Sequence, residues 1–454
     1  MGPKSKHPES GNLFQQALVD QINMEHPLVK LAELIEWQEF EHAWSGLFPS
    51  KRGRPATPTR LIAGLLYLQH AQGCSDEELL WTWVENPYMQ YFCGMTHFQH
   101  RLPIDPSSMT RWRKRLGESG VEKLLEQTIA AAKKGRVIKE RSLERVIVDS
   151  TVMEKAVAFP TDSRLLERGR QHLVRLADLL GMKLRQNYNR QAPRMAVQVA
   201  RYAHAKQFKR MQAELKRLRT VVGRVWRDIE RQMAGVTDER LQGRASSILS
   251  RVKRLLEQKR GDKNKLYSLH APEVECIGKG KVRHPYEFGV KVSVTVTHKE
   301  GLVVGMKSLP GNPYDGHSLA GALKQVGELA GKLPKAVFVD KGYRGAEIAD
   351  TQIWRSGQKR GVTASIRKAI HRRSMVEPMI GHMKSEGRLG RNWLQGAEGD
   401  AIHAVLCGAG HNLRMILRAL RLFWTFIILA WLRCIAVMEK AGFSKMTIQP
   451  SNCG

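Results

Sequence analysis

The chain has 454 residues, of which 42% are hydrophobic, so it is too long for one ordinary core and has the apolar content of a globular protein with two or three domains. Lys and Arg number 74 against 43 Asp and Glu, which gives a formal net charge of +31. An excess of this size favours a polyanionic partner, either nucleic acid or an anionic membrane surface.

The membrane alternative has little support. The apolar run LFWTFIILAWL at 422–432 spans 11 residues before Arg433, against roughly 20 needed to cross a bilayer, so we expect a buried or partner-facing helix and no membrane partner. The N-terminal MGPKSKHPES has no apolar stretch typical of a signal peptide, and we expect a cytoplasmic location. Six scattered cysteines without a C-x-x-C pair or a His cluster at zinc spacing indicate reduced thiols packed as small apolar residues.

Residues 1–140 are predicted to be helical, because start signals precede apolar periodic runs. Thr57-Pro58 is expected as N-cap and first residue of one helix, Ser75 with Glu78 as a capping box, and Asp105-Pro106 as the start of a third. The third helix carries a basic group: Arg111, Arg113, Lys114 and Arg115. This group indicates either a helix-turn-helix that reads DNA or a basic face exposed to solvent.

A basic loop, KRGRPATPTR at 51–60, precedes the first of these helices. Its Arg52 and Arg54 suit an A·T-rich minor groove, whose narrow walls concentrate negative potential. The alternative is a polar linker that leads into the Thr57 cap.

The stretch from Arg164 to Arg260 has a different composition, with 25 Lys or Arg against 8 Asp or Glu. Apolar residues with alternating spacings of four and three run through Met211, Leu215, Leu218, Val222, Val225, Ile229 and Met233. A second apolar set at 248–256 follows a break near Ala234-Gly235, which predicts a helical hairpin. The charge favours an arm for the DNA backbone over a spacer, because a spacer would mix signs.

After this arm the apolar period changes to two, which predicts strands. Alternating valines at 290–296 and the segment LVVGMKS, separated by a turn at 299–301, predict a β-hairpin. A helix at 316–331, the strand KAVFVD, a short strand VTASI at 362–366 and helices from about Ser374 are expected to follow.

Two of the predicted strands end in a carboxylate, VIVD at Asp149 and VFVD at Asp340. A strand-end Asp is commonly a turn former, but two after fully apolar runs can meet at one edge of a mixed sheet. Glu377 is a third candidate. It belongs either to a Ser374–Glu377 capping box or to a helix face on which Arg373, Glu377, Lys384 and Arg388 form a site for metal and phosphate.

The order of these elements is that of a ribonuclease H-like fold with the basic arm inserted after its first strand. The chain resembles the DDE transposases of bacterial insertion sequences, in particular the insertion-sequence-five family. The resemblance rests on DSTVMEKAVAFPTD (149–162), KGKVRHPYEFG (279–289), GNPYDGHSL (311–319), VDKGYRG (339–345) and Arg373-x3-Glu377-x6-Lys384. The family pattern has Tyr three positions before the Arg, where this chain has Ile370.

The expected fold is of the α/β class, a ribonuclease H-like mixed sheet with flanking helices, interrupted by a helical insertion and preceded by an all-helical domain. Its parts are a DNA-binding or dimerisation domain (1–140), a catalytic domain (141–163 and 265–420), the basic insertion (164–264) and a helical tail (421–454).

The resemblance implies that Asp149, Asp340 and Glu377 are catalytic and hold two divalent cations, Mg²⁺ or Mn²⁺. It also implies that Arg373 and Lys384 bind phosphate and that Tyr343 and Arg344 contact DNA. The remaining candidates have structural expectations: Asp315 and His317 start a helix, and Trp226 and Trp393 pack rather than stack on a flipped base.

The implied function is a transposase that binds terminal inverted repeats, cleaves phosphodiester bonds at the ends of a mobile element and joins the 3′-hydroxyls to target DNA. We expect a homodimer or larger assembly on double-stranded DNA, associated with the bacterial nucleoid. Two alternatives are a non-catalytic DNA-binding protein derived from a transposase and a ribonuclease H-like nuclease acting on branched nucleic acid.

Overall fold

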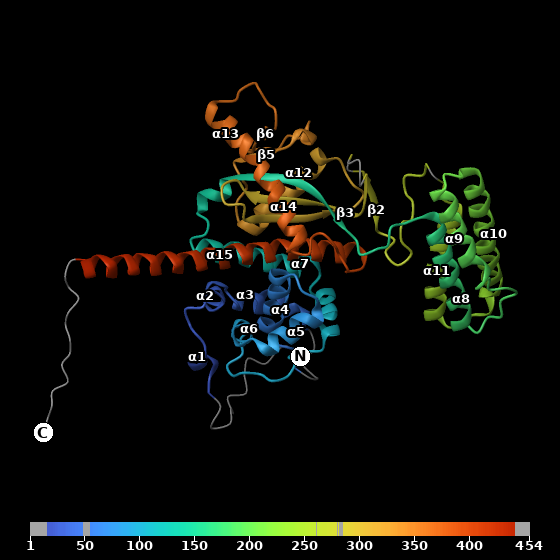
Figure 1. The fold of residues 1–454 in the computed structure, drawn as a ribbon, viewed down its shortest axis with the longest axis horizontal. Helices are drawn as coiled ribbons and strands as arrows, with labels where there is room; N and C mark the ends of the chain where they lie inside the picture. The colour runs from blue at the N-terminus through green and yellow to red at the C-terminus, as the bar shows by residue number, and fades with distance from the viewer. Residues whose placement is uncertain (1–15, 49–54, 260, 279, 281–284, 441–454) are drawn as a thin grey trace.

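The computed structural model describes residues 16–48, 55–259, 261–278, 280 and 285–440, with side chains up to Leu422. A six-stranded sheet and a group of N-terminal helices lie on opposite sides of the long helix α15 (Gly396–Lys440), and a separate helical bundle lies beyond the sheet edge (Figure 1). The fold is therefore mixed α/β with a helical N-terminal region.

The N-terminal region is helical, as the sequence predicts. Its helices are α1 (Leu18–Gln21), α2 (Pro27–Leu34), α3 (Gln38–Trp44), α4 (Thr59–Gln72), α5 (Asp76–Glu85), α6 (Pro87–Phe92) and α7 (Pro106–Lys134). The Ser75–Glu78 capping box is present, and Asp105 caps α7. The Thr57 cap is wrong by one position, because Pro58 is the N-cap residue of α4 and Thr59 begins the helix.

The sheet contains β1 (Arg145–Glu154), β2 (Glu275–Gly278), β3 (Tyr286–Thr297), β4 (Val303–Leu309), β5 (Ala336–Val339) and β6 (Gln352–Arg355). The strand order is β2-β3-β1-β5-β6, with β4 also paired to β3. β3 and β4 form the predicted hairpin and pair in antiparallel fashion, as do β1 and β3, whereas β1, β5 and β6 are parallel.

The predicted strand VTASI is wrong. The short strand next to β5 is β6, ten residues earlier in the chain, and helix α13 (Ala364–Arg372) covers most of VTASI. The Thr363 side chain accepts a hydrogen bond from Ile366 N at 3.3 Å, so it caps that helix.

The remaining helices of the main body are α12 (Asp315–Ala330), α14 (Val376–Ser385) and α15. Helix α15 packs on α4, α7 and β4, and one hydrophobic core runs from the N-terminal helices through the sheet to α15. Helix α15 is continuous through residues 420 and 421, where the sequence suggested a domain boundary. None of the helices in the described part of the chain has the length and apolar content that a bilayer crossing requires.

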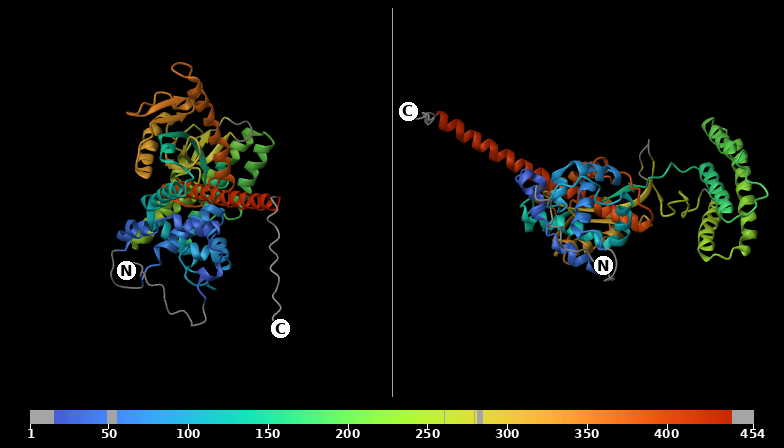
Figure 2. Two further views of the ribbon diagram at one scale, coloured as in Figure 1. Left: turned by 90° about the vertical axis from the view of Figure 1, so that its left-hand side faces the viewer. Right: turned by 90° about the horizontal axis from the view of Figure 1, so that it is seen from below.

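The basic insertion forms a bundle of α8 (Asp162–Leu179), α9 (Gln191–His204), α10 (Phe208–Gln232) and α11 (Glu239–Glu257). The predicted hairpin corresponds to α10 and α11, and α8 and α9 complete a second hydrophobic core. The bundle stands apart from the main body and connects to it through extended segments after β1 and before β2 (Figure 2).

Candidate active site

Asp149 and Asp340 are neighbours in the sheet. The parallel pairing of β1 with β5 aligns Arg145 with Ala336 and Ile147 with Phe338. Continued by two residues, this register sets Asp149, in the middle of β1, beside Asp340, which directly follows β5. The expectation that the first strand ends at Asp149 is wrong, because β1 continues to Glu154 in its pairing with β3. The buried valines of β1 and β5 fix both backbones, so the two carboxylates lie on one rigid support.

The Asp149 carboxylate is largely buried. Its Oδ1 accepts a hydrogen bond from Ser150 N at 2.8 Å, and its Oδ2 lies 3.1 Å from Arg373 Nη1. Burial raises the pKa of Asp149, and the nearby carboxylates of Asp340 and Glu377 raise it further, against the lowering effects of the Ser150 hydrogen bond and Arg373. A cation at this position would relieve that electrostatic cost.

Asp340 also has a local structural role. Its Oδ1 accepts a hydrogen bond from Gly342 N at 2.8 Å and caps a short 3₁₀ turn, Lys341–Tyr343. A Cβ on Gly342 would lie 3.0 Å from that Oδ1 and 3.3 Å from Asp315 Oδ2, so the missing side chain allows both carboxylates to approach. The turn-former interpretation and the metal-ligand interpretation of Asp340 are thus compatible.

Asp315 is a fourth carboxylate in this region, which sequence reasoning assigned only to the start of a helix. It is the first residue of α12, and its Oδ1 lies 3.0 Å from Lys291 Nζ. Its position near Gly342 depends on the packing of α12 against the turn after β5. Local sequence carries no signal for that approach.

Glu377 lies in the first turn of α14, with 66% of its side chain exposed. Its Oε1 is 3.5 Å from Arg373 Nη2. The alternative capping box is absent, because α14 begins after Met375 without a side-chain cap and Ser374 Oγ donates to His371 O at 3.1 Å. The Glu377 carboxylate is therefore not used as a helix cap.

Arg373 connects two of the three acids, since its guanidinium contacts both Asp149 and Glu377. Its Nε also donates to Ser356 Oγ at 3.0 Å, which holds the side chain against the strand end. Lys384 lies in the last turn of the same helix, α14, as the predicted spacing requires.

The comparisons with known proteins agree with this architecture. Residues 16–115 match a family model described as a transposase domain, DUF772, and residues 260–409 match one described as a transposase DDE domain. An uncharacterised protein of Rhizobium meliloti, ORF8 in the nfe locus, is 50% identical over 207 residues, which is 45% of this chain and 100% of that protein. The chain belongs to the DDE transposases. No solved structure matches it.

Several predicted contact residues of the transposase lie elsewhere than expected. Arg388 does not share the α14 face, because the helix ends at Ser385 and Arg388 has a positive φ of 65°. Its guanidinium donates to Cys74 O and stacks 5.0 Å from the centroid of the Trp393 ring. Arg388 therefore joins the N-terminal helices to the loop before α15, and its predicted place beside Glu377 is wrong.

Tyr343 was predicted to contact DNA, but its side chain is fully buried. A buried ring cannot contact DNA directly, whereas the neighbouring Arg344 is exposed. The Tyr343 hydroxyl has no hydrogen-bond partner among the described residues. Burial raises the pKa of Tyr343, and the carboxylates of Asp315, Asp149 and Asp340 add to this, so the ring packs beneath the acidic site.

The basic group of α7 divides between surface and core. Arg111, Lys114 and Arg115 are exposed. Arg113 is buried, with Nη1 2.9 Å from Asp76 Oδ2 and Nη2 2.7 Å from Gln69 Oε1. The prediction that Arg113 contacts DNA is therefore corrected: it joins α7 to α5 and α4. Arg52 and Arg54 lie outside the described residues.

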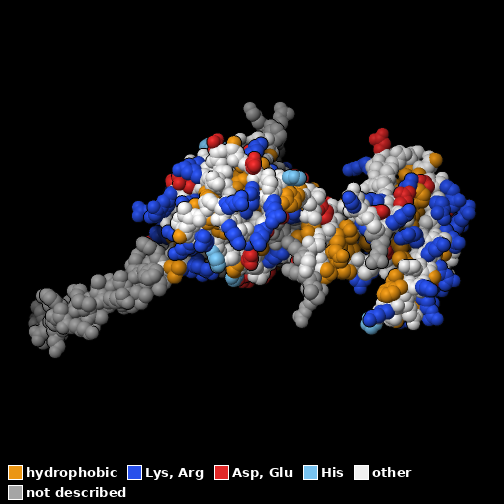
Figure 3. Space-filling view, turned by 90° about the horizontal axis from the view of Figure 1, so that it is seen from above, with side chains coloured by type: hydrophobic (Ala, Val, Ile, Leu, Met, Phe, Trp, Pro, Cys, Tyr) orange, Lys and Arg blue, Asp and Glu red, His pale blue; other side chains and the backbone are white. Residues whose placement is uncertain are grey.

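The insertion of the transposase has a basic surface, where Lys and Arg side chains gather along the outer edge of the bundle (Figure 3). Exposed basic residues of α10 include Lys216, Arg217, Arg224, Arg227 and Arg231. The apolar side of α10 faces the bundle core, where Trp226 Nε1 donates to Leu249 O at 3.0 Å. The expected packing role of Trp226 agrees with this contact, whereas Trp393 is 54% exposed beneath Arg388 and Arg391.

Proposed function

We propose that this transposase cuts DNA phosphodiester bonds at the ends of a mobile element and transfers the 3′-hydroxyl ends to target DNA, with Asp149, Asp340 and Glu377 as its catalytic acids. The observation that supports this most directly is the in-register placement of Asp149 beside Asp340, with Glu377 linked to Asp149 through Arg373. These contacts support one site for three carboxylates from distant parts of the sequence, at the point where β5 ends beside β1.

The donor set fits two divalent cations, Mg²⁺ or Mn²⁺. Hard cations prefer carboxylate oxygens, and a largely buried Asp149 with a raised pKa is a ligand whose charge is not fully compensated by protein groups. When bound, such ions activate the attacking oxygen and stabilise the leaving oxygen of an in-line phosphodiester displacement.

The basic residues of the site complement this role. The planar guanidinium of Arg373 matches the geometry of a phosphate as well as that of a carboxylate. With Asp149 and Glu377 holding cations, Arg373 would be free to position the scissile phosphate. Lys384, in the last turn of α14, and the exposed Arg344 are proposed to contact the DNA backbone nearby.

The proposal includes the ribonuclease H-like fold, membership of the insertion-sequence-five family and the predicted domain division at 140, 164 and 264. Support for the fold comes from a sheet in which antiparallel β4, β3 and β1 are followed by parallel β5 and β6. Exposed Arg111, Lys114 and Arg115 and the surface of α10 are proposed to bind the terminal inverted repeats. At least a dimer is required, because two element ends are joined together.

The test is cleavage of a labelled duplex that carries one element end, in Mg²⁺ or Mn²⁺. Asp149→Asn, Asp340→Asn and Glu377→Gln should each abolish nicking and strand transfer while gel-shift binding persists. Glu347→Gln, an exposed acid near the same loop, is the matched control and should cut normally.

Three outcomes would contradict the proposal. If the intact protein binds element ends but never cuts them with either metal, the chain is a DNA-binding derivative of a transposase. If it cuts only branched DNA or RNA–DNA hybrids offered in parallel, it is a nuclease. If the three variants cut as well as the control, the acids do not form the active site.

A further inference from the structure

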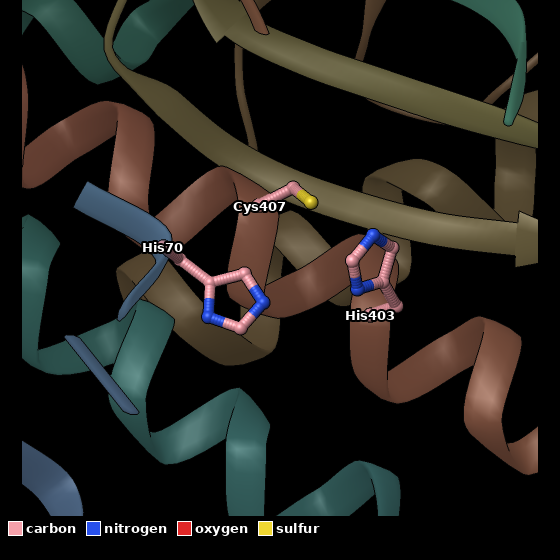
Figure 4. Close-up of side chains that lie close together, drawn as sticks. All are labelled: His70, His403 and Cys407. Atoms are coloured by element: carbon pink, nitrogen blue, oxygen red, sulfur yellow. The ribbon is translucent and has the colours of Figure 1, made fainter. Parts of the chain in front are cut away.

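A second cluster of metal-ligating side chains lies between α4 and α15, built from nitrogen and sulfur rather than oxygen. His70 comes from α4, and His403 and Cys407 come from α15, where a spacing of four residues places them on one helix face (Figure 4). Their ligand atoms all lie within 4.8 Å of one another, and all three residues are buried. The active-site acids do not take part in this cluster.

The two imidazoles have lone pairs available for a ligand. His70 Nδ1 lies 3.1 Å from Leu66 O, and His403 Nε2 lies 3.0 Å from Arg388 O. A carbonyl oxygen only accepts, so each of these nitrogens carries the proton and the opposite nitrogen of each ring is bare. His70 is only 2% exposed, and its Nε2 has no hydrogen-bond partner among the described residues.

This arrangement is the one that metal-binding histidines commonly have, with one ring nitrogen anchored to a backbone carbonyl and the other directed at the ion. Burial lowers the pKa of His70, and burial lowers the pKa of His403 to about 3, so both rings are neutral at physiological pH. A buried acceptor without a hydrogen-bond partner is costly unless a water molecule or an ion binds it.

We propose that His70 Nε2, His403 Nδ1 and Cys407 Sγ bind a transition-metal ion of the zinc class, which fastens the N-terminal helices to α15. Two imidazoles and one thiolate form a borderline-soft donor set that suits Zn²⁺ and does not suit Mg²⁺. Zn–N and Zn–S bonds are about 2.1 and 2.3 Å long, so binding requires the three side chains to draw slightly closer together.

The fourth coordination position has space available. A cavity of about 450 Å³ lies beside the cluster, and both His70 and His403 line it together with Asp76, Arg113 and Arg388. A water molecule in this cavity would complete a tetrahedral site. The cavity also gives the ion a route to a cluster that is otherwise closed by packed helices.

The positive charges around the cluster require that the Cys407 thiol lose its proton when a metal ion binds. Arg388 and Arg113 oppose a cation, and Asp76 offsets Arg113 through its ion pair. Burial raises the pKa of the Cys407 thiol to about 12, so the metal-free protein holds a neutral thiol. Binding forms the metal–sulfur bond and releases the thiol proton to solvent, which supplies one negative charge to the site.

A metal ion bound to this cluster would have a structural role. Helix α15 packs on both α4 and β4, so an ion shared by α4 and α15 stabilises the position of the N-terminal helices relative to the sheet. The two predicted metal sites are distinguishable by chemistry, because only this one contains a thiolate.

The test uses the full-length protein titrated anaerobically with Co²⁺ as a spectroscopic substitute for Zn²⁺, in an Asp149→Asn background that weakens the acidic site. We expect tetrahedral Co²⁺ absorption with a thiolate-to-cobalt charge-transfer band that saturates at about one ion per chain and is displaced by Zn²⁺. Cys407→Ser should lose the charge-transfer band, and His70→Gln and His403→Gln should lose the tetrahedral spectrum.

Cys93→Ser is the matched control, because Cys93 is also buried against α4 but lies outside the cluster. It should retain the full band. Absence of the band in the parent protein, or its survival in Cys407→Ser, would overturn the proposal. Because the histidine variants could fail to fold, a second measurement follows thermal unfolding: Zn²⁺ should raise the melting temperature of the parent and of Cys93→Ser but not of Cys407→Ser, and equal shifts in all three would also overturn it.

Discussion

Arg373 Nη1 lies 3.1 Å from Asp149 Oδ2, although the two residues are 224 positions apart in the chain. The same guanidinium reaches Glu377 Oε1 at 3.5 Å, so one arginine neutralises two acids in the metal-free site. Under the proposed function, Arg373 would exchange these carboxylate partners for phosphate partners when cations and DNA bind.

Arg373→Gln tests that exchange. We expect cleavage to fall by roughly 10²–10³-fold, the scale of removing one positioned donor from a transition state, while DNA binding weakens little. Arg373→Lys should recover only part of the rate, because a lysine keeps the charge but not the planar fork. Arg367→Gln, an exposed arginine on the neighbouring α13, is the control. Single-turnover cleavage measures all three, and a normal rate for Arg373→Gln would contradict the assignment.

Asp149→Asn should stabilise the metal-free protein at neutral pH. Because the pKa of Asp149 is raised, the folded state binds the Asp149 proton more tightly than the unfolded state does. Protonation of Asp149 therefore stabilises the fold at low pH, and this stabilisation is lost as the pH rises through the pKa of the folded state. The variant should therefore melt a few degrees above the parent at pH 7 in EDTA. The difference should disappear below the ordinary Asp pKa and shrink when Mg²⁺ is added. Calorimetry across pH measures this, and a variant that melts lower at pH 7 would refute it.

Tyr343→Phe separates packing from DNA contact. The hydroxyl is buried without a described partner, so its removal should change the free energy of unfolding by less than about 0.5 kcal/mol, and DNA affinity should not change. Tyr343→Ala should cost about 3–5 kcal/mol, because it empties the space beneath the acids. Denaturant melts and gel shifts measure both, and a Phe variant with weakened DNA binding would restore the direct-contact interpretation.

Arg113 and Lys114 should behave oppositely although they are adjacent. Arg113→Met removes the buried ion-pair partner of the half-buried Asp76, which keeps only the hydrogen bond from Gln69, and should destabilise the protein by about 1–3 kcal/mol. Lys114→Ala should leave the melting temperature unchanged and weaken DNA binding, because Lys114 is exposed. Adding Asp76→Leu to Arg113→Met should recover part of the stability. Equal stability losses for the two single variants would contradict this division of α7.

The surface of α10 is predicted to bind DNA phosphates. Replacing Arg224, Arg227 and Arg231 by Gln should weaken binding at low salt and reduce the slope of log K against log salt by about 0.9 for each phosphate that the protein no longer neutralises. Lys324→Gln, an exposed residue on α12, is the control and should leave the slope unchanged. Fluorescence anisotropy at several salt concentrations measures the slope, and an unchanged slope for the triple variant would assign the bundle another role.

Much of the fold and part of the site could be predicted from local sequence. The capping signals at Ser75 and Asp105 and the alternating valines of β3 specify their elements through hydrogen bonds and burial within a few residues. The apolar runs before Asp149 and Asp340 likewise indicated two strands, although only β5 stops at its acid and β1 continues to Glu154. These features depend on backbone geometry and side-chain periodicity, which the sequence states directly.

The tertiary structure decided what those side chains contact. The register of β1 against β5 sets Asp149 beside Asp340, the packing of α12 brings Asp315 to the same place, and the burial of one face of α7 separates Arg113 from Lys114. The pairing of His70 with His403 and Cys407 likewise requires α4 to cross α15. Such contacts join residues far apart in the chain, so they follow from how whole elements pack to exclude water, and no local spacing records them.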